Sequence, residues 1–388
     1  MKKKYLALVI AAMLLCGCSN EPQISTVEAG KIAEETPSKI TFGNDLNTEN
    51  QSSETPSSGG SSDEWGVKVD ADVTVAQGAT YGVYYPTFKT YSEAEAFEIK
   101  QKLMGDIDAE FIKVDSHGDY NYIWETEDIS LVVRGGAGSF AIDGDYAIFI
   151  NDIFGPPRPG SQSNADHFTQ CELDFCTREQ AVNAVAEILA ELEVSVADDP
   201  EVFSIALPDL LNEAEYNRVN HPYWAENYPE VIGKEYECYY IKFNAELGGV
   251  PIYNELINYT TVPDLITGNP EIKAIYSADG LKYLYVDMYP VGFELAEEIT
   301  KLVSAEDAAQ LAVSKYADVA GQTAVNIDKI TLMYVFLLKG NDPSVKFVPA
   351  WICSGTIRAV STERGKTPIE SIKKLDIIID ARTGQEII

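Results

Sequence analysis

Short apolar runs joined by tight-turn residues constrain this fold more than any other feature of the sequence. Ile129 to Arg134 and Phe140 to Ile142 have the pattern of strands, and Asp143-Gly144 follows before the apolar run Tyr146 to Ile150. Asp and Gly tolerate the positive φ angles that a two-residue hairpin turn requires. This stretch therefore predicts a meander of antiparallel strands.

The second half of the chain repeats the pattern. The expected hairpins are Glu235 to Leu247 with Val250 to Tyr253 around Gly248-Gly249, Ile272 to Tyr276 with Leu281 to Met288 around Asp279-Gly280, and Ile330 to Leu338 with Val345 to Cys353 around residues 340–343. A last strand is expected from Leu375 to Ile379. Because tight turns join these runs, antiparallel pairing is expected here too.

Three helices are predicted from their N-terminal caps. In each, a Ser or Thr stands three residues before an acid or amide side chain, which is the arrangement of a capping box. The pairs are Ser92 with Glu95, Thr177 with Gln180, and Ser304 with Asp307. Apolar residues then recur at helical spacing, so each helix is expected to pack on a sheet. The predicted class is therefore α+β, with antiparallel sheets each packed by helices.

The N-terminus predicts an export signal. Lys2, Lys3 and Lys4 precede the apolar run Tyr5 to Leu15, which is shorter than the ~20 residues a membrane-spanning helix needs. The run closes with Leu-Cys-Gly-Cys, whose last residue is Cys18.

These closing residues resemble the lipobox of bacterial lipoproteins, in which the Cys thiol is joined to diacylglycerol and becomes the new N-terminus. The resemblance implies a signal peptide over residues 1–17, a lipid anchor at Cys18, and a place on the outer face of the cell membrane. Two or more acyl chains hold a protein stably at a membrane. The alternative is an ordinary secretory signal in which Cys18 is incidental.

Residues 18–64 predict a disordered tether. They are rich in Ser, Thr, Glu, Asn and Gly and include the run QSSETPSSGGSS at 51–62. Such a segment buries too little apolar surface to offset its ordering entropy. As a flexible coil it would reach roughly 40 Å, so we expect it to lift the folded part clear of the headgroups.

The remaining chain is long enough for two modules. Four prolines between residues 198 and 234 mark a connector and place a boundary near Gly233. We therefore expect two tandem modules after the tether, over residues 65–233 and 234–388.

Acidic residues dominate the charge, with 61 Asp and Glu against 29 Lys and Arg. A surface of this sign repels nucleic acid, which excludes nucleic-acid binding. Two interpretations remain open: recognition of a basic partner or of divalent cations, and a merely solvated acidic surface.

The cysteines of the folded part are Cys171, Cys176, Cys238 and Cys353. Cys171 and Cys176 are the one close pair, and either a disulfide between them or unpaired thiols fits the sequence. Zinc is not expected, because no second close cysteine pair or nearby His completes a ligand set.

The second half carries an ordered set of short motifs, which are Gly249-Val250-Pro251-Ile252, Ala278-Asp279-Gly280-Leu281, Ser304-Ala305-Glu306-Asp307-Ala308, Phe347-Val348-Pro349-Ala350-Trp351 and Ile379-Asp380-Ala381-Arg382-Thr383-Gly384. This order resembles the YycI/YycH-type extracytoplasmic regulators and related PepSY-like modules. The resemblance implies a non-enzymatic module that acts on a sensor histidine kinase outside the membrane.

This chain departs from that family in its anchor, which is a lipid where those regulators use a transmembrane helix. In that respect it is more similar to uncharacterised lipoproteins of Gram-positive bacteria that carry the module. The large ring of Trp351 is expected to cap the helix that begins after Ser304. Whether the N-terminal module is a diverged second copy stays open.

Catalytic motifs are missing from the sequence. His117, His167 and His221 stand alone without an HExxH pattern, and there is no Gly-x-Ser-x-Gly elbow. The oxygen-rich stretch 115–121 lacks the spaced acids of a calcium loop. No enzymatic activity, metal site or cofactor is expected.

Aromatic residues gather in the proline-bearing connector, and the candidate ligand-binding residues are Tyr216, His221, Tyr223, Trp224 and Tyr228. Rings offer much contact area at small entropy cost, so they can line a groove for a peptide or glycan. The alternative is that they hold the two modules together.

Two functions follow from these features. The first is a lipid-anchored binding or regulatory protein that contacts an envelope protein, such as a sensor kinase. The alternative is a ligand-binding lipoprotein that takes a peptide, glycan or cation for a transporter or the cell wall.

Overall fold

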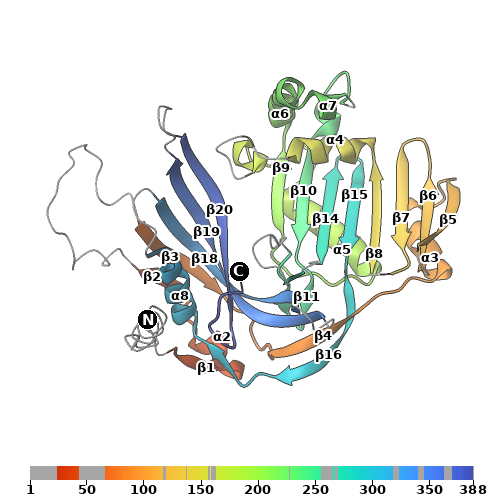
Figure 1. Ribbon diagram of the computed structural model, residues 1–388. Coiled ribbons are helices and arrows are strands. Elements are labelled where there is room, and N and C mark those ends of the chain that lie inside the picture. Colours follow the sequence, from red (N-terminus) through yellow and green to blue (C-terminus); the bar gives the residue numbers. More distant parts are fainter. Residues whose placement is uncertain are drawn as a thin grey trace, which may run out of the picture.

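The computed structural model describes residues 24–42, 66–116, 119–136, 138–155, 158, 163–226, 228–254, 265–266, 270–317, 323–339, 345–361 and 369–387. Over these residues the chain forms two large sheets with helices on their faces (Figure 1). The α+β class and the division into two modules are confirmed. No helix in the described ranges is long and apolar enough to cross a membrane.

Sheet I has eight strands in the order β5-β6-β7-β8-β15-β14-β10-β9. All its neighbouring strands are antiparallel. The strands are β5 (Glu110–Ser116), β6 (Asp119–Glu125), β7 (Ile129–Arg134), β8 (Ser139–Gly144), β9 (Glu201–Ile205), β10 (Cys238–Phe243), β14 (Glu271–Ser277) and β15 (Gly280–Asp287).

Helices lie on both faces of sheet I. On one face α3 (Glu93–Met104) packs on β6 and β7, and α5 (Arg178–Glu191) packs on β9, β10 and β14. On the other, α4 (Asp145–Phe154) packs on β8 and β15 and carries α6 (Leu207–Asn220) and α7 (Pro222–Ala225) above it (Figure 1). Short 3-10 turns, η4 (Asn164–His167) and η5 (Lys234–Tyr236), complete this helical layer.

Sheet II runs in the order β16-β4-β19-β18-β3-β2, with β20 paired to β19 and β13 to β18. Its strands are β2 (Lys39–Phe42), β3 (Gly66–Thr74), β4 (Gly82–Phe88), β13 (Leu265–Ile266), β16 (Pro290–Glu298), β18 (Thr323–Lys339), β19 (Val345–Ser361) and β20 (Ile369–Asp380). The β3–β18 pair is parallel and the other pairs are antiparallel. Helix α8 (Ala305–Ala317) covers one face.

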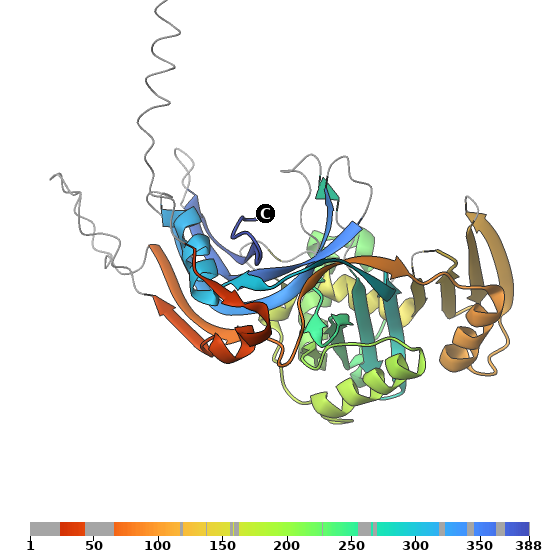
Figure 2. The ribbon, with the colours of Figure 1, turned by 90° about the horizontal axis from the view of Figure 1, so that it is seen from below.

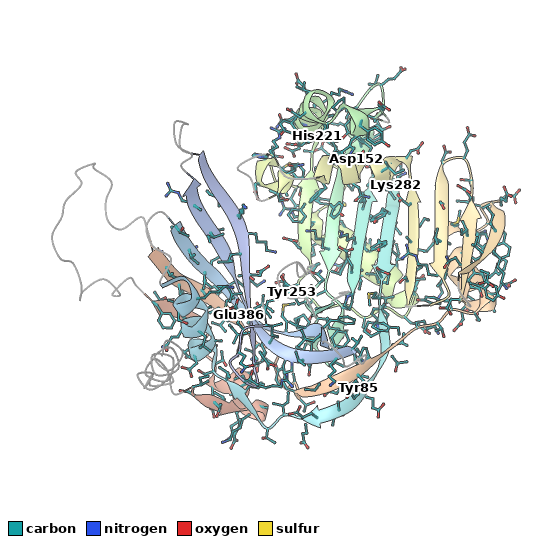
Figure 3. All side chains as sticks on the ribbon, viewed as in Figure 1. Tyr85, Asp152, His221, Tyr253, Lys282 and Glu386 are labelled. Atoms are coloured by element: carbon teal, nitrogen blue, oxygen red, sulfur yellow. The ribbon has the colours of Figure 1, made fainter. Side chains whose placement is uncertain are left out.

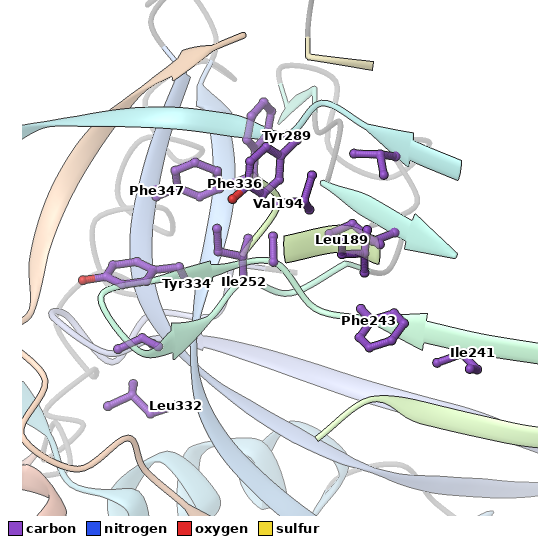
Figure 4. Close-up of a cluster of buried hydrophobic side chains, with 14 of the residues drawn as sticks. Leu189, Val194, Ile241, Phe243, Ile252, Tyr289, Leu332, Tyr334, Phe336 and Phe347 are labelled. Carbon is purple, nitrogen blue, oxygen red and sulfur yellow. The ribbon is translucent and has the colours of Figure 1, made fainter. Parts of the chain in front are cut away.

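One apolar core runs through the junction of the two sheets (Figure 4). Ile241 and Phe243 of β10 and Leu189 of α5 come from the sheet I side. Tyr334 and Phe336 of β18 come from sheet II, and all five side chains are buried. Two smaller strands, β11 (Glu246–Leu247) and β12 (Val250–Pro251), lie at this junction. The modules therefore share one core.

The expected module boundary near Gly233 does not separate the sheets. β10, β14 and β15 follow residue 233 but join β5 to β9, whereas β3 and β4 precede it and join β16 to β20. The two modules are thus interleaved along the chain and not tandem. The four prolines lie around β9, α6 and α7, inside the sheet I module. The boundary prediction is wrong because local turn chemistry carries no information on which distant strands will pair.

The N-terminal part of the predicted tether is folded. Residues 24–42 form β1 (Thr26–Glu28), η1 (Ala29–Lys31), α2 (Ile32–Glu35) and β2. β1 pairs with β17 (Lys301–Val303), and β2 pairs with β3. Ala29, Ile32 and Ile40 are buried. The tether prediction is wrong here because a few well-spaced apolar residues are enough to dock a short segment on an existing core.

Residues 43–65, with the Ser-rich run, lie outside the described ranges. The strands on either side of them are paired with each other, with Phe42 opposite Val69. This stretch therefore connects β2 to β3 within sheet II and does not link the folded part to the predicted lipid anchor at Cys18.

The three capped helices are confirmed. Ser92 and Thr177 close capping boxes at the starts of α3 and α5, and Ser304 Oγ accepts a hydrogen bond from the Asp307 N–H at α8. Bonds from Ser92 and Lys89 hold the pKa of Glu95 low, at about 2, with the Lys89 bond contributing most. Trp351 Nε1 donates to the Val303 carbonyl just before α8, at 2.9 Å.

Two strand predictions are wrong. Tyr146 to Ile150 lies in α4, because Ala147, Phe149, Ile150 and Ile153 have the spacing that buries one face of a helix. Gly144 is extended and begins that helix in place of a hairpin turn. Glu235 to Leu247 is divided into η5, β10 and β11. The hairpins at Gly248-Gly249 and at Asp279-Gly280 are confirmed.

Gly355 provides a stability test. A Cβ at this position would overlap the backbone oxygen of Asn326, beside the bulge in the β18–β19 pair. We expect Gly355→Ala to cost about 3 kcal/mol of unfolding free energy by overpacking. Urea unfolding measures it. In the control Gly292→Ala, the new Cβ meets Thr87 Cβ at 3.5 Å, an ordinary contact. Equal stability of the two variants would contradict the packing of β18 on β19.

Candidate functional site

Three of the five connector aromatics form a row in the helical layer. The rings of Tyr216 and His221 lie 5.9 Å apart, and His221 stacks on Trp224 at 5.0 Å. Arg158 extends the row, with its guanidinium 4.2 Å from the Tyr216 ring. Figure 3 labels His221 in this layer, above sheet I. The row holds α6 and α7 to the segment after α4.

Arg158 is fixed from the other side by a buried acid. Its Nη2 lies 2.8 Å from Glu213 Oε1 and its Nε donates to Oε2 at 3.0 Å. The Glu213 side chain is fully buried. Burial raises the pKa of Glu213, and the adjacent guanidinium opposes that shift by compensating the charge of the carboxylate.

The other two connector aromatics lie apart from the row. Tyr228 is buried against Phe149 of α4, with ring centroids 5.0 Å apart, and its hydroxyl accepts from Asn217 Nδ2 at 3.0 Å. Burial raises the pKa of Tyr228 to about 12. Tyr223 is 79% exposed. The five residues thus do not line one groove. The row and Tyr228 join elements of the helical layer within one module and do not join the two modules.

A cavity of about 320 Å³ opens beside the connector, and we call it the connector pocket. Its lining residues are Asp145, Tyr146, Phe149, Pro229, Glu235, Tyr236, Asp279 and Lys282. They come from α4, the connector, η5 and the β14–β15 hairpin. None of these lining residues is among the five candidates from the sequence, because the elements that carry them are far apart in the chain and the run Tyr146 to Ile150 has the pattern of a strand.

Aromatic rings form the wall of the connector pocket and acids surround it. Tyr146 and Tyr236 stack at 5.4 Å, and Phe149 meets Tyr236 edge-on at 5.3 Å. The pocket also has three carboxylates, from Asp145, Glu235 and Asp279. Lys282, labelled in Figure 3, already places its ammonium 5.6 Å from the Tyr146 ring centroid. Rings with nearby carboxylates are suited to a cationic group.

Exposed apolar side chains gather at the far end of sheet I. Five large side chains here are each 38–45% exposed: Phe97 of α3, Ile107 between α3 and β5, Phe111 and Val114 of β5, and Tyr120 of β6. We call this surface the aromatic corner. Phe97, Phe111 and the buried Trp124 form a triangle with centroids 5.1–5.2 Å apart.

Strand β5 ends sheet I at this corner. Its free edge presents backbone N–H and C=O groups that a further strand can pair with. Between residues 91 and 128 the chain has eleven Asp and Glu against three Lys, so the corner is also strongly acidic.

A larger cavity of about 610 Å³ lies beside the N-terminal segment. Ala29, Tyr81, Tyr84, Leu295 and Ile299 supply most of its apolar lining. It marks the seam where residues 24–42 dock on β4 and β16.

The cysteines and the histidines add no site in the described ranges. Cys171, Cys176, Cys238 and Cys353 are all free thiols, so the 171/176 disulfide is not formed. Burial raises the pKa of the Cys353 thiol to about 12. No group of three or more His, Cys, Asp or Glu side chains among the described residues is arranged to hold a metal ion. His117 lies outside those ranges.

Comparison with known proteins defines the fold and no more. No protein-family model matches the chain, and no curated protein matches it. The chain is similar in structure to an uncharacterised protein from Eubacterium rectale, with a TM-score of 0.63 and 16% sequence identity. The match covers 91% of this chain and 94% of that one. The fold described above is therefore shared with that protein.

The two isolated tyrosines provide a matched pair of variants. Tyr228→Phe removes a buried hydroxyl and leaves the Asn217 amide short of a partner, so we expect it to cost about 1 kcal/mol of unfolding free energy. Tyr223→Phe removes an exposed hydroxyl and should change stability by less than about 0.5 kcal/mol. Urea unfolding compares the two, and equal losses would contradict the buried position of Tyr228.

Proposed function

We propose that this protein is a lipid-anchored, extracytoplasmic binding protein that acts through contact with another protein of the cell envelope. The aromatic corner is the observation that carries the proposal. Apolar side chains left exposed at the free edge of a sheet are a feature of contact surfaces. The resemblance of the second half to YycI/YycH-type regulators makes a sensor kinase one partner of this kind.

The occupant that suits the corner is an extended, basic segment of the partner. An added strand would satisfy the open backbone groups of β5, and its alternate side chains would meet Phe111 on one face and Val114 on the other. The acidic excess around β5 favours Lys and Arg in that segment and steers its approach.

Capture from membranes tests this proposal. We expect Phe111→Ser with Tyr120→Ser to lower the amount of crosslinked partner about tenfold, because two exposed apolar contacts are lost. The control, Val219→Ser with Tyr223→Ser, removes exposed apolar groups from the helical layer. Thermal unfolding confirms that both variants fold. Equal capture by the two folded double variants would refute the corner as the contact surface.

The connector pocket supports a second function, binding of a ligand with a cationic head. Its rings and carboxylates select an alkylammonium or a Lys side chain over a neutral sugar. A bound ligand would displace Lys282 from the Tyr146 ring and pair with the acids of the pocket.

Thermal-shift measurements test this second function. We expect a Lys-containing tripeptide to raise the melting temperature, because a ligand that binds only the folded state stabilises it. Tyr236→Ala should abolish the shift, and Tyr223→Ala should preserve it. A shift produced equally by neutral sugars, or one that survives Tyr236→Ala, would argue against a cation site here.

A further inference from the structure

The N-terminal segment is attached to the body from its first described residues. Ser304 N–H donates to the Ser25 carbonyl, and Ser25 N–H donates to the Asp307 carboxylate at the start of α8. Thr26, Val27 and Glu28 then pair with β17, and Ala29 N–H donates to the Thr300 carbonyl at 2.9 Å. These bonds fix residues 25–29 to β17 and to the start of α8.

Further contacts make the attachment part of the fold. The side chain of Ile24 lies so close to Gly384 that a Cβ there would be 2.8 Å from Ile24 Cδ1. Ile32 is 1% exposed and Ala29 is 5% exposed. Burial of side chains of this size contributes about 2 kcal/mol each at most, which is enough to resist fraying of a short segment.

Only eight residue steps separate Cys18 from Thr26. A fully extended chain covers at most about 3.5 Å per step, so Thr26 lies within about 28 Å of the Cys18 Cα. The segment from Cys18 to Thr26, which we call the leash, thus reaches at most about 28 Å. This is less than the roughly 40 Å expected of a flexible tether over residues 18–64.

We infer that the β1 end of this protein faces the membrane, with Thr26 within about 28 Å of the anchored Cys18, and that the aromatic corner at the opposite end is directed away from the membrane. The inference rests on the lipid anchor at Cys18 in the proposed function. β1 and the β5–β6–α3 corner lie at opposite ends of the molecule in both ribbon views (Figures 1 and 2). The two sheets share one core, so the body transmits this orientation from end to end.

Charge does not produce this orientation. The β1 end carries Glu28, Glu34 and Glu35 against Lys31 and Lys301. Lys31 is paired with Glu28 at 2.8 Å, and Lys301 stands opposite Glu28 in the β1–β17 pair. Such a surface gains nothing from anionic headgroups. The short leash alone holds it there, so the contact should not weaken when salt screens the charges.

Energy transfer to labelled lipid tests the inference. The full mature protein, acylated in cells, is inserted in phosphatidylcholine vesicles that carry a headgroup acceptor. Cys171 and Cys176 are replaced by Ser, and one dye is placed through Lys31→Cys or Glu110→Cys. We expect transfer from position 31 to exceed transfer from position 110 several-fold, at low and at high salt.

A lengthened leash is the matched control. Insertion of about twenty Gly and Ser residues between Asn20 and Glu21 adds a flexible coil and should lower transfer from position 31. Equal transfer from the two positions, or transfer unchanged by the insertion, would overturn the inference and leave the corner proposal intact. Failure of the acylation-competent protein to bind vesicles would overturn the anchor on which both depend.

Discussion

The apolar core between the two sheets is the interaction on which the rest of this structure depends. Tyr334 and Phe336 of β18 meet Leu189 of α5 and Phe243 of β10 in one packed cluster. Close-packed protein interiors have low compressibility and resist relative sliding of the elements that share them. The two sheets therefore form one body, although different helices cover the faces of each sheet.

Interleaving of the chain follows from that core. The chain enters sheet II with β2 to β4 and passes to sheet I for β5 to β10. After β11, β12 and the short β13 of sheet II, it adds β14 and β15 to sheet I and ends in sheet II with β16 and β18 to β20. Neither sheet is complete without strands from both halves of the chain. A body of this kind is suited to holding surfaces at fixed positions, since separation of its modules would expose the shared core.

The candidate binding surfaces and the N-terminal attachment lie away from the core. The aromatic corner is at the edge of sheet I, and residues of α4 and η5 line the connector pocket. The N-terminal segment pairs with β17 at the other end of the molecule. A short lipid leash at one end and a contact surface at the other would let one rigid body span the space between membrane and partner. The Arg158–Glu213 pair and the stacked row beside it hold α6 and α7 to the segment that follows α4.

Sequence by itself determined the local elements of this protein. Capping pairs such as Thr177 with Gln180 located the helices, and turn residues such as Asp279-Gly280 located hairpins, because both depend on backbone chemistry within a few residues. Tertiary structure alone decided that Tyr146 to Ile150 is helical and that residues 24–42 are folded. It also decided that the two modules interleave and which aromatic rings line the connector pocket. Those outcomes depend on burial against residues that are tens to hundreds of positions away, and a local pattern contains no record of its distant neighbours.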